Sequence, residues 1–373
     1  MVFRFLHASD LHLGKPFGGY PEGIRGRLRE ARHGAIGRLA VAARQGGAGV
    51  ILLAGDTFDA ETPAPDTLRQ ALQAMAGAGD LTWVLMPGNH DSLAGAELWR
   101  RIGAGAAPNL LLALEPAPIA LAPGSVLLPA PCTQRRPGRD LTEWFGASTP
   151  EGQHRIGLAH GAITDFTGEE GTLGIIPPDR AALSGLDYLA LGDWHGRREI
   201  GPRTWYSGTP EAEAFKHPGP AGALLVTLAA PGALPQVAPV ATGALDWQMV
   251  ELALLPGEGE GALAAALPPV AARRDTLVKL VARGRLALPE RAALSAACAA
   301  AAPDFGWFDA DFAGLATEAR PDDLDLIDRG GALRAAAEAL LAEAENPALA
   351  AAEREVAAAA LSRLFALSQE ALA

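Results

Sequence analysis

The sequence of 373 residues has only two cysteines, Cys132 and Cys298. They lie far apart along the chain, so neither a disulfide framework nor a zinc site built from cysteines is expected. Lysine is also rare, with Lys15, Lys216 and Lys279 as its only examples, and positive charge therefore comes mostly from arginine. Any reactive or metal-binding site must rest mainly on other residue types.

A long uninterrupted apolar run is also missing. Arg4, His7 and Asp10 interrupt the apolar segment at the N-terminus, which therefore does not resemble a signal peptide. Residues 110–131 are mostly apolar, but they contain Glu115 and five prolines, which excludes a membrane helix. We therefore expect a cytoplasmic protein without a membrane segment.

An excess of positive charge is absent as well, because the net charge is -12. This charge argues against a protein that coats DNA through general attraction. It does not exclude nucleic acid as a ligand, since a local basic patch and bound dications can still attract phosphate.

Five short polar motifs stand out, each at the end of an apolar run. The motifs are Asp10-Leu11-His12, Gly55-Asp56-Thr57-Phe58-Asp59, Gly88-Asn89-His90-Asp91, His160-Gly161 and Gly192-Asp193-Trp194-His195. The apolar runs before them are residues 2–8, 50–54, 81–86, 156–159 and 188–191. Short apolar runs bounded by glycine or proline predict buried strands. Because strand ends in layered α/β folds converge on one edge, we expect the polar side chains to meet there.

The motifs supply carboxylates, imidazoles and an amide oxygen, which are ligands of divalent metals. Asp10 and His12 are two residues apart, so one turn can direct both at the same ion. The carboxylate of Asp56 has two oxygens and can bridge two ions. Any one motif could be an ordinary turn, but the complete ordered series predicts a two-metal site that hydrolyses phosphate esters.

In this order the motifs resemble those of the calcineurin-like metallophosphoesterase superfamily, D-x-H, G-D-x-x-D, G-N-H-D, a later H and G-H-x-H. The resemblance implies an α/β fold, a four-layer α-β-β-α sandwich. It implies that one divalent ion binds four side chains and that Asp56 bridges to a second ion. The first set is Asp10, His12, Asp56 and His195, and the second is completed by Asn89, His160 and Asp193.

The same resemblance assigns catalysis without metal binding to His90. It would lie beside the scissile phosphate, where it stabilises charge or protonates the leaving oxygen, and Asp91 would orient it. The expected mechanism is in-line attack by a metal-bound hydroxide. Asp59 would orient a ligand or simply cap its turn, and His7 would have a core or supporting role.

One position departs from the family pattern, because Asp193 stands where the family has a histidine. A carboxylate still binds metal, but it has a shorter reach and adds negative charge. It favours a harder ion, so the family pattern alone does not identify the metal. A weak or empty second site is the other possibility.

Three segments resemble the SbcD-type DNA repair exonuclease subunits, namely residues 5–14, 186–192 and 206–210. This resemblance implies cleavage of DNA with Mn²⁺, with iron, zinc and magnesium as alternative metals. It also implies a partner ATPase of the coiled-coil, SbcC-like ABC type, with a homodimer also possible. Arg197 and Arg198 directly follow a ligand motif and are expected to bind substrate. Further phosphate contacts could come from two arginine clusters, which could equally be solvated faces: Arg25, Arg27, Arg29 and Arg32, and Arg135, Arg136 and Arg139.

Segments rich in proline and glycine, at 231–239 and 256–261, separate the motifs from the rest of the chain. We expect a metallophosphoesterase domain over 1–245, a small α+β cap over 246–330 and a helical segment over 331–373. In that helical segment, one helical face would pack on its own domain or dock a partner, and it carries Val356, Ala360, Leu364 and Leu367.

Two other functions remain open. The acidic net charge mildly favours a small-molecule phosphodiesterase or phosphatase. The altered metal site allows a weakly catalytic scaffold subunit of an ATPase complex.

Overall fold

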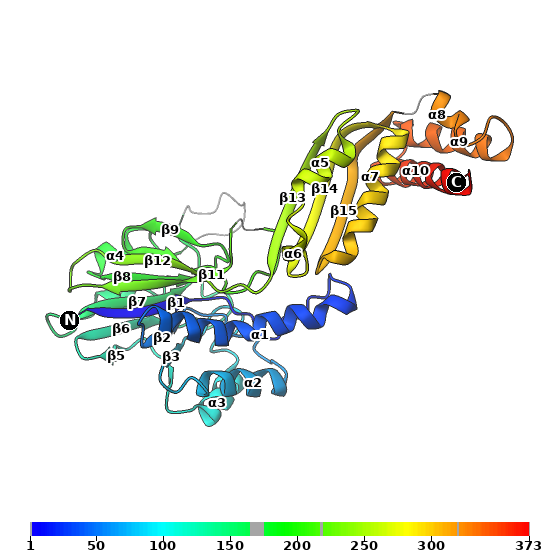
Figure 1. Cartoon of the computed structure of the whole chain (residues 1–373). Coiled ribbons are helices and arrows are strands. Elements are labelled where there is room, and N and C mark those ends of the chain that lie inside the picture. Colours follow the sequence, from blue (N-terminus) through cyan, green and yellow to red (C-terminus); the bar gives the residue numbers. More distant parts are fainter. Residues whose placement is uncertain (1, 165–174, 217–218, 319–320, 373) are drawn as a thin grey trace. The chain divides into compact units, whose positions relative to one another are not determined.

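The computed structural model describes residues 2–164, 175–216, 219–318 and 321–372. They form two compact units, the first ending at Leu245 and the second beginning at Asp246 (Figure 1). Residues 331–372, expected to form a separate helical segment, belong to the second unit. The reason is packing, because Leu361 and Phe365 share a hydrophobic core with Leu288 of the cap.

The first unit contains two six-stranded sheets, each built mainly from parallel strands. The order in one sheet is β12 (Gln236–Ala241), β11 (Gly222–Leu228), β1 (Phe3–Ala8), β2 (Val50–Leu53), β3 (Thr82–Leu85) and β4 (Leu110–Leu112). The order in the other is β5 (Ile119–Ala122), β6 (Ser125–Ala130), β7 (His154–His160), β8 (Tyr188–Gly192), β10 (Thr204–Tyr206) and β9 (Arg198–Gly201).

The two sheets pack face to face, and strand alternation decides which side chain lies between them. In β1, Phe5 belongs to the core that includes Leu158 and Tyr188 of the opposite sheet. Its neighbour Leu6 points the other way and packs with helix residues such as Ile36. The four layers of the predicted α-β-β-α sandwich are therefore present.

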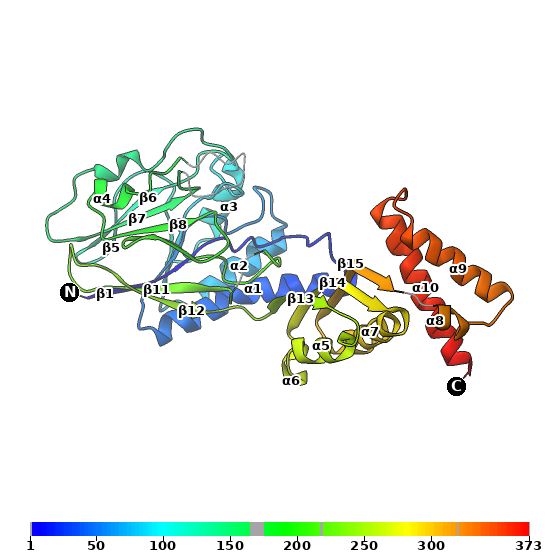
Figure 2. The same ribbon diagram turned by 90° about the horizontal axis from the view of Figure 1, so that it is seen from above.

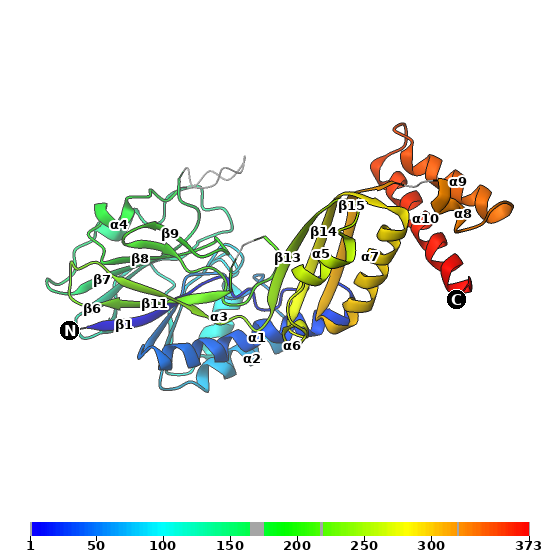
Figure 3. The same cartoon turned by 45° about the horizontal axis from the view of Figure 1, so that its top comes forward.

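Helices cover the two outer faces of the sandwich. The larger set is α1 (Glu22–Gln45), α2 (Pro65–Ala76) and α3 (Ala96–Gly105), which pack on the sheet containing β1 (Figure 1). The other face carries α4 (Arg180–Leu183) and the short helix η1 (Glu143–Gly146), as seen for α4 in Figure 3.

The second unit has a parallel three-stranded sheet of β13 (Asp246–Leu254), β14 (Thr276–Ala287) and β15 (Trp307–Glu318). Its helices are α5 (Gly259–Ala266), α6 (Val270–Arg273), α7 (Leu288–Ala301), η2 (Ala302–Asp304), α8 (Pro321–Asp325), α9 (Ala332–Glu345) and α10 (Ala351–Leu372). Helices α5 and α7 pack on this sheet around Leu280 and Leu294 (Figure 2).

The face expected for helix α10 is buried only in part. Leu364 packs against the core that contains Leu361 and Phe365. Val356 and Leu367, by contrast, are 69% and 46% exposed. The alanine-rich sequence does not show which face of the helix is buried, and the side chains of Leu361 and Phe365 determine it. Within the described part of the chain, no helix is both long and apolar enough to cross a membrane.

Candidate metal centre

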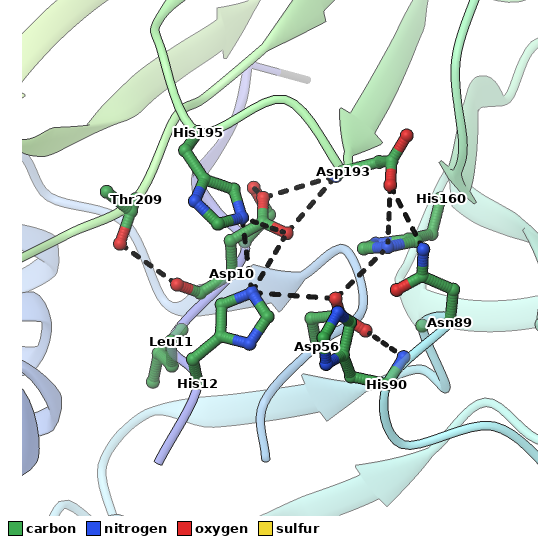
Figure 4. A network of polar contacts seen from close by, with 12 residues as sticks. Asp10, Leu11, His12, Asp56, Asn89, His90, His160, Asp193, His195 and Thr209 are labelled. Atoms are coloured by element: carbon green, nitrogen blue, oxygen red, sulfur yellow. Dashed lines mark hydrogen bonds and ion pairs between the residues drawn. The ribbon is translucent and has the colours of Figure 1, made fainter. Parts of the chain in front are cut away.

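The five polar motifs follow β1, β2, β3, β7 and β8, and their side chains meet at one edge of the sandwich (Figure 4). Four of these side chains come from residues with unusual backbone geometry: the φ angles of Asp10, His12, Asp56 and Asp193 are 56°, 42°, 51° and 99°. Non-glycine residues with positive φ are uncommon and persist where the surrounding structure enforces them. Such geometry often occurs at functional sites, and here it coincides with the predicted ligands.

The first predicted ligand set fits a single ion. Two atoms that bind one ion at about 2.1 Å can lie at most about 4.2 Å apart. The Nε2 atoms of His12 and His195 are 3.2 Å apart, and each lies 4.0 or 3.9 Å from Asp10 Oδ1. Two N–H groups that face each other at this distance would repel each other. A cation between the two nitrogens would instead accept a lone pair from each.

The second predicted set also converges on one point. His160 Nε2 lies 3.5 Å from Asp56 Oδ2 and 3.7 Å from Asp193 Oδ1. Asn89 Oδ1 and His160 Nε2 are buried, and neither has a hydrogen-bond partner among the described residues. Buried polar atoms are rarely left unpaired, so these two atoms indicate a missing ligand.

One oxygen belongs to both sets. Asp56 Oδ2 lies 3.6 Å from His12 Nε2 and 3.5 Å from His160 Nε2. An oxygen at these distances from a ligand of each set is placed to bind both ions at once. The donors present therefore fit a pair of divalent metals bridged by Asp56.

Two of the three ligand histidines are held through the other ring nitrogen. His195 Nδ1 lies 2.7 Å from Glu213 Oε1, and His160 Nδ1 lies 2.8 Å from the Ala54 carbonyl. An acceptor at Nδ1 keeps the proton there, so the lone pair of Nε2 faces the metal site. His12 Nδ1 lies 3.2 Å from Asp59 Oδ1, but the two do not form a hydrogen bond.

The electrostatics of the site also favour bound cations. Burial raises the pKa of Asp193; His160 opposes this increase in the pKa, and the nearby carboxylates of Asp10 and Asp56 add to it. Burial would lower the pKa of His160, but Asp56 outweighs it and raises the pKa well above the usual value. A cluster of carboxylates with so little water is stabilised by bound positive charge.

His90 lies at the edge of this site, half-buried, with its Nδ1 atom 3.0 Å from the backbone carbonyl of Asp59. The expected contact of Asp91 with this ring does not occur. Asp91 is fully buried and accepts hydrogen bonds from the backbone N–H groups of Phe58 and Gly88. It therefore ties two metal-binding loops together, and the Asp59 carbonyl orients His90 instead.

The sequence did not mark Glu213, and it gave Arg32 a different role. Glu213 contacts His195, and Arg32 donates to Glu213 Oε2 at 3.0 Å. Arg32 was expected among possible DNA contacts, but it is 1% exposed and donates to the backbone carbonyls of Asp10 and Leu11. No motif marks Glu213, because only the tertiary fold brings its loop beside His195.

A pocket of about 540 Å³ opens beside the second ligand set. Asn89, His160 and Asp193 line one part of it. Three exposed arginines line another part, Arg135, Arg136 and Arg139, and within the described residues no ion pair occupies their side chains. Arg197 and Arg198 are exposed and lie elsewhere, Arg197 in a smaller pocket beside His195 and Arg198 at the start of β9.

Comparisons with known proteins identify the family of the chain. The family described as calcineurin-like phosphoesterase matches residues 3–215. The chain is similar to the uncharacterized metallophosphoesterase YhaO of Bacillus subtilis (strain 168), with 29% identity over 249 residues, 60% of this chain and 56% of that protein. The chain thus spans little more than half the length of this relative.

Among solved structures, one similar chain is TT1561 of Thermus thermophilus, with a TM-score of 0.38 and 12% identity over 56% of this chain and 90% of that chain. Because the family match spans more than half of the sequence, the chain belongs to the calcineurin-like phosphoesterase family.

Proposed function

We propose that the protein is a two-metal phosphodiesterase that cleaves DNA as the nuclease subunit of a repair complex. The observation that carries the two-metal part is the position of Asp56 Oδ2, 3.6 Å from His12 Nε2 and 3.5 Å from His160 Nε2. When bound, the two ions would supply Lewis acidity and activate the attacking water.

The protein groups around the ions have separate tasks. His160 and His195 present Nε2 lone pairs, because an acceptor holds each Nδ1 proton. His90 donates its Nδ1 proton to the Asp59 carbonyl, which directs Nε2 to the substrate. In the imidazolium form, which carries a second proton on Nε2, His90 would give that proton to the leaving oxygen as a general acid.

Manganese is the proposed metal. The two ligand sets together supply the carboxylates of Asp10, Asp56 and Asp193 and the amide oxygen of Asn89, in addition to three imidazoles. This mixture of oxygen and imidazole suits Mn²⁺ or iron, and replacement of an imidazole by Asp193 moves the preference away from softer ions.

A polynucleotide is the proposed substrate because of the charge around the pocket. The chain as a whole carries a net charge of -12, yet Arg135, Arg136 and Arg139 gather beside the metal ligands. Exposed arginines near a phosphoester site suit further phosphates on either side of the scissile one. Arg197 and Arg198 are proposed to extend this contact beyond His195.

An SbcC-like ABC-type ATPase is the proposed partner, with a homodimer of this chain as a second possible assembly. The exposed Val356 and Leu367 side chains of α10 offer apolar contacts for the base of a coiled coil. A small-molecule phosphodiesterase is the second candidate function, because a pocket of about 540 Å³ also has the size of a typical small-ligand site.

The test uses the purified full chain with Mn²⁺ and two substrates, end-labelled linear DNA and bis(p-nitrophenyl) phosphate. The His90→Ala variant serves as the contamination control. Cleavage of DNA by the wild type and not by the variant supports the nuclease function. Hydrolysis of the small ester alone would overturn the DNA assignment in favour of a small-molecule substrate. Metal binding without hydrolysis of either would favour a scaffold role.

A further inference from the structure

Glu213 lies outside every motif, yet its carboxylate contacts three other side chains. Its Oε1 atom accepts from His195 Nδ1 at 2.7 Å. Its Oε2 atom lies 3.0 Å from Arg32 Nη2 and 2.9 Å from Lys15 Nζ. The side chain of Arg32 is 2% exposed and that of Glu213 is 11% exposed, so water screens these charges little.

Arg32 connects this carboxylate to the first metal-binding turn. The same guanidinium donates to the backbone carbonyls of Asp10 and Leu11 and to the carbonyl of Glu211. One buried arginine of α1 therefore fixes the loop after β1 and the loop that carries Glu213. Because a guanidinium is planar and rigid, it sets the distance between the two loops.

These contacts form a series that ends at the first ligand set. Arg32 and Lys15 hold Glu213, and Glu213 holds the ring of His195, whose Nε2 atom lies 3.2 Å from His12 Nε2. His160 has no such carboxylate at its Nδ1 atom, which faces the carbonyl of Ala54. Loss of the Glu213 charge should therefore affect the two ions unequally.

We propose that Glu213 is a positioning residue for the first metal, fixed by Arg32 and Lys15, and that it sets the affinity of that ion alone. A carboxylate behind a ligand imidazole fixes the ring and increases its basicity. The proposal rests on the two-metal site of the proposed function and holds for any phosphoester substrate.

The experiment measures stepwise Mn²⁺ binding to the apo protein by calorimetry. Glu213→Gln keeps the size of the side chain but turns an amide toward His195, Arg32 and Lys15. We expect the affinity of one Mn²⁺ step to fall about 10- to 100-fold while the other step changes less than about threefold. The unequal loss of Mn²⁺ affinity is informative, because general destabilisation of the fold would weaken both binding steps.

Glu211→Gln is the matched control. Glu211 is two residues away, 1% exposed and paired with Arg38 at 2.6 Å, but its side chain bonds to Arg38 and to backbone amides rather than to the ligand histidines. The change should lower the thermal midpoint and leave both Mn²⁺ steps within about twofold. If Glu213→Gln does not fold, the Lys15→Met variant tests the proposal instead. We expect it to reduce the Mn²⁺ affinity of the same step roughly threefold, which is less than the effect of Glu213→Gln.

Unchanged Mn²⁺ steps in the Glu213 variant, or equal losses in the Glu211 control, would overturn the proposal. Absence of a second Mn²⁺ step in the wild type would instead overturn the two-metal function itself. The two failures are therefore distinguishable in the same titration.

Discussion

Asn89 donates its side-chain amide to Asp193 Oδ1 at 3.2 Å, and this hydrogen bond fixes which end of the amide faces the second metal site. The Asn89 carbonyl oxygen is left buried, and the described residues offer it no partner. The departure from the family pattern at position 193 therefore has a second consequence. In the proposed site, Asp193 binds the second ion and also orients Asn89, another proposed ligand of that ion.

Replacement of Asp193 by asparagine should lower the Mn²⁺ affinity of the second ligand set at least about tenfold, because it removes a charged ligand and the acceptor of the Asn89 bond. The Mn²⁺ affinity of the first ligand set should change less than about threefold. Asp193→His, which restores the family residue, should shift the preference toward Zn²⁺. Calorimetric titration with each metal measures both effects, and two unchanged Mn²⁺ steps in Asp193→Asn would rule out Asp193 as a ligand.

Gly88→Ala should disrupt the bridge between the two ions. A Cβ atom at Gly88 would lie 2.2 Å from Asp56 Oδ1 and 2.3 Å from the Asp56 backbone nitrogen. The collision must displace the bridging carboxylate, and overpacking of this kind costs about 1–3 kcal/mol of unfolding free energy. Metal content and urea unfolding measure the two effects. Gly18→Ala is the control, since a Cβ there meets no atom within 4 Å.

The triple replacement of Arg135, Arg136 and Arg139 by alanine should raise KM for DNA and leave bis(p-nitrophenyl) phosphate hydrolysis unchanged. Each lost phosphate contact should reduce the slope of log affinity against log salt by about 0.9 for duplex DNA. Binding assays at several salt concentrations measure the slope. Arg69→Ala on α2 is the control, and an equal effect of that change would mean that the three arginines have no special role.

His7 should make the protein sensitive to acid. It is fully buried between Tyr188 OH at 3.0 Å and the Leu191 carbonyl at 3.2 Å, and burial lowers its pKa to about 3. In the unfolded chain the pKa is near 6.5, so below that pH the unfolded state binds a proton that the native state refuses. Unfolding free energy should therefore fall between about pH 6.5 and pH 4, by about 3 kcal/mol from this group.

Urea unfolding at several pH values, in the presence of a chelator, tests the His7 prediction. His7→Gln keeps one donor and one acceptor but does not titrate. It should be less stable than the wild type at about pH 8 and should lose less stability on acidification. Parallel pH curves for the two proteins would show that His7 does not titrate as described.

The sequence predicted that the motif side chains meet, because local signals and topology agree there. Each motif follows a short apolar strand, and parallel strands place their ends on one edge. Asp10 and His160 lie far apart along the chain, yet the pattern predicts both at this edge, whereas their assignment as ligands rests on the family resemblance.

The supporting residues could not be predicted in this way. Arg32 looked like part of an exposed cluster, because four arginines along a helix carry no sign of which one turns inward. Asp91 follows His90 directly, yet its side chain binds two backbone amides from other directions. Glu213 acquires its partner only when the loop after β10 folds against α1. Such contacts depend on tertiary packing rather than on sequence spacing.

Electron paramagnetic resonance of the protein loaded with Mn²⁺ tests the bridged two-metal centre most directly. If Asp56 Oδ2 joins the ions, two equivalents of Mn²⁺ per chain should give an exchange-coupled spectrum, and Asp56→Asn should abolish the coupling. A spectrum of isolated Mn²⁺ ions at saturation, or binding of a single equivalent by the wild type, would contradict a bridged pair at this site.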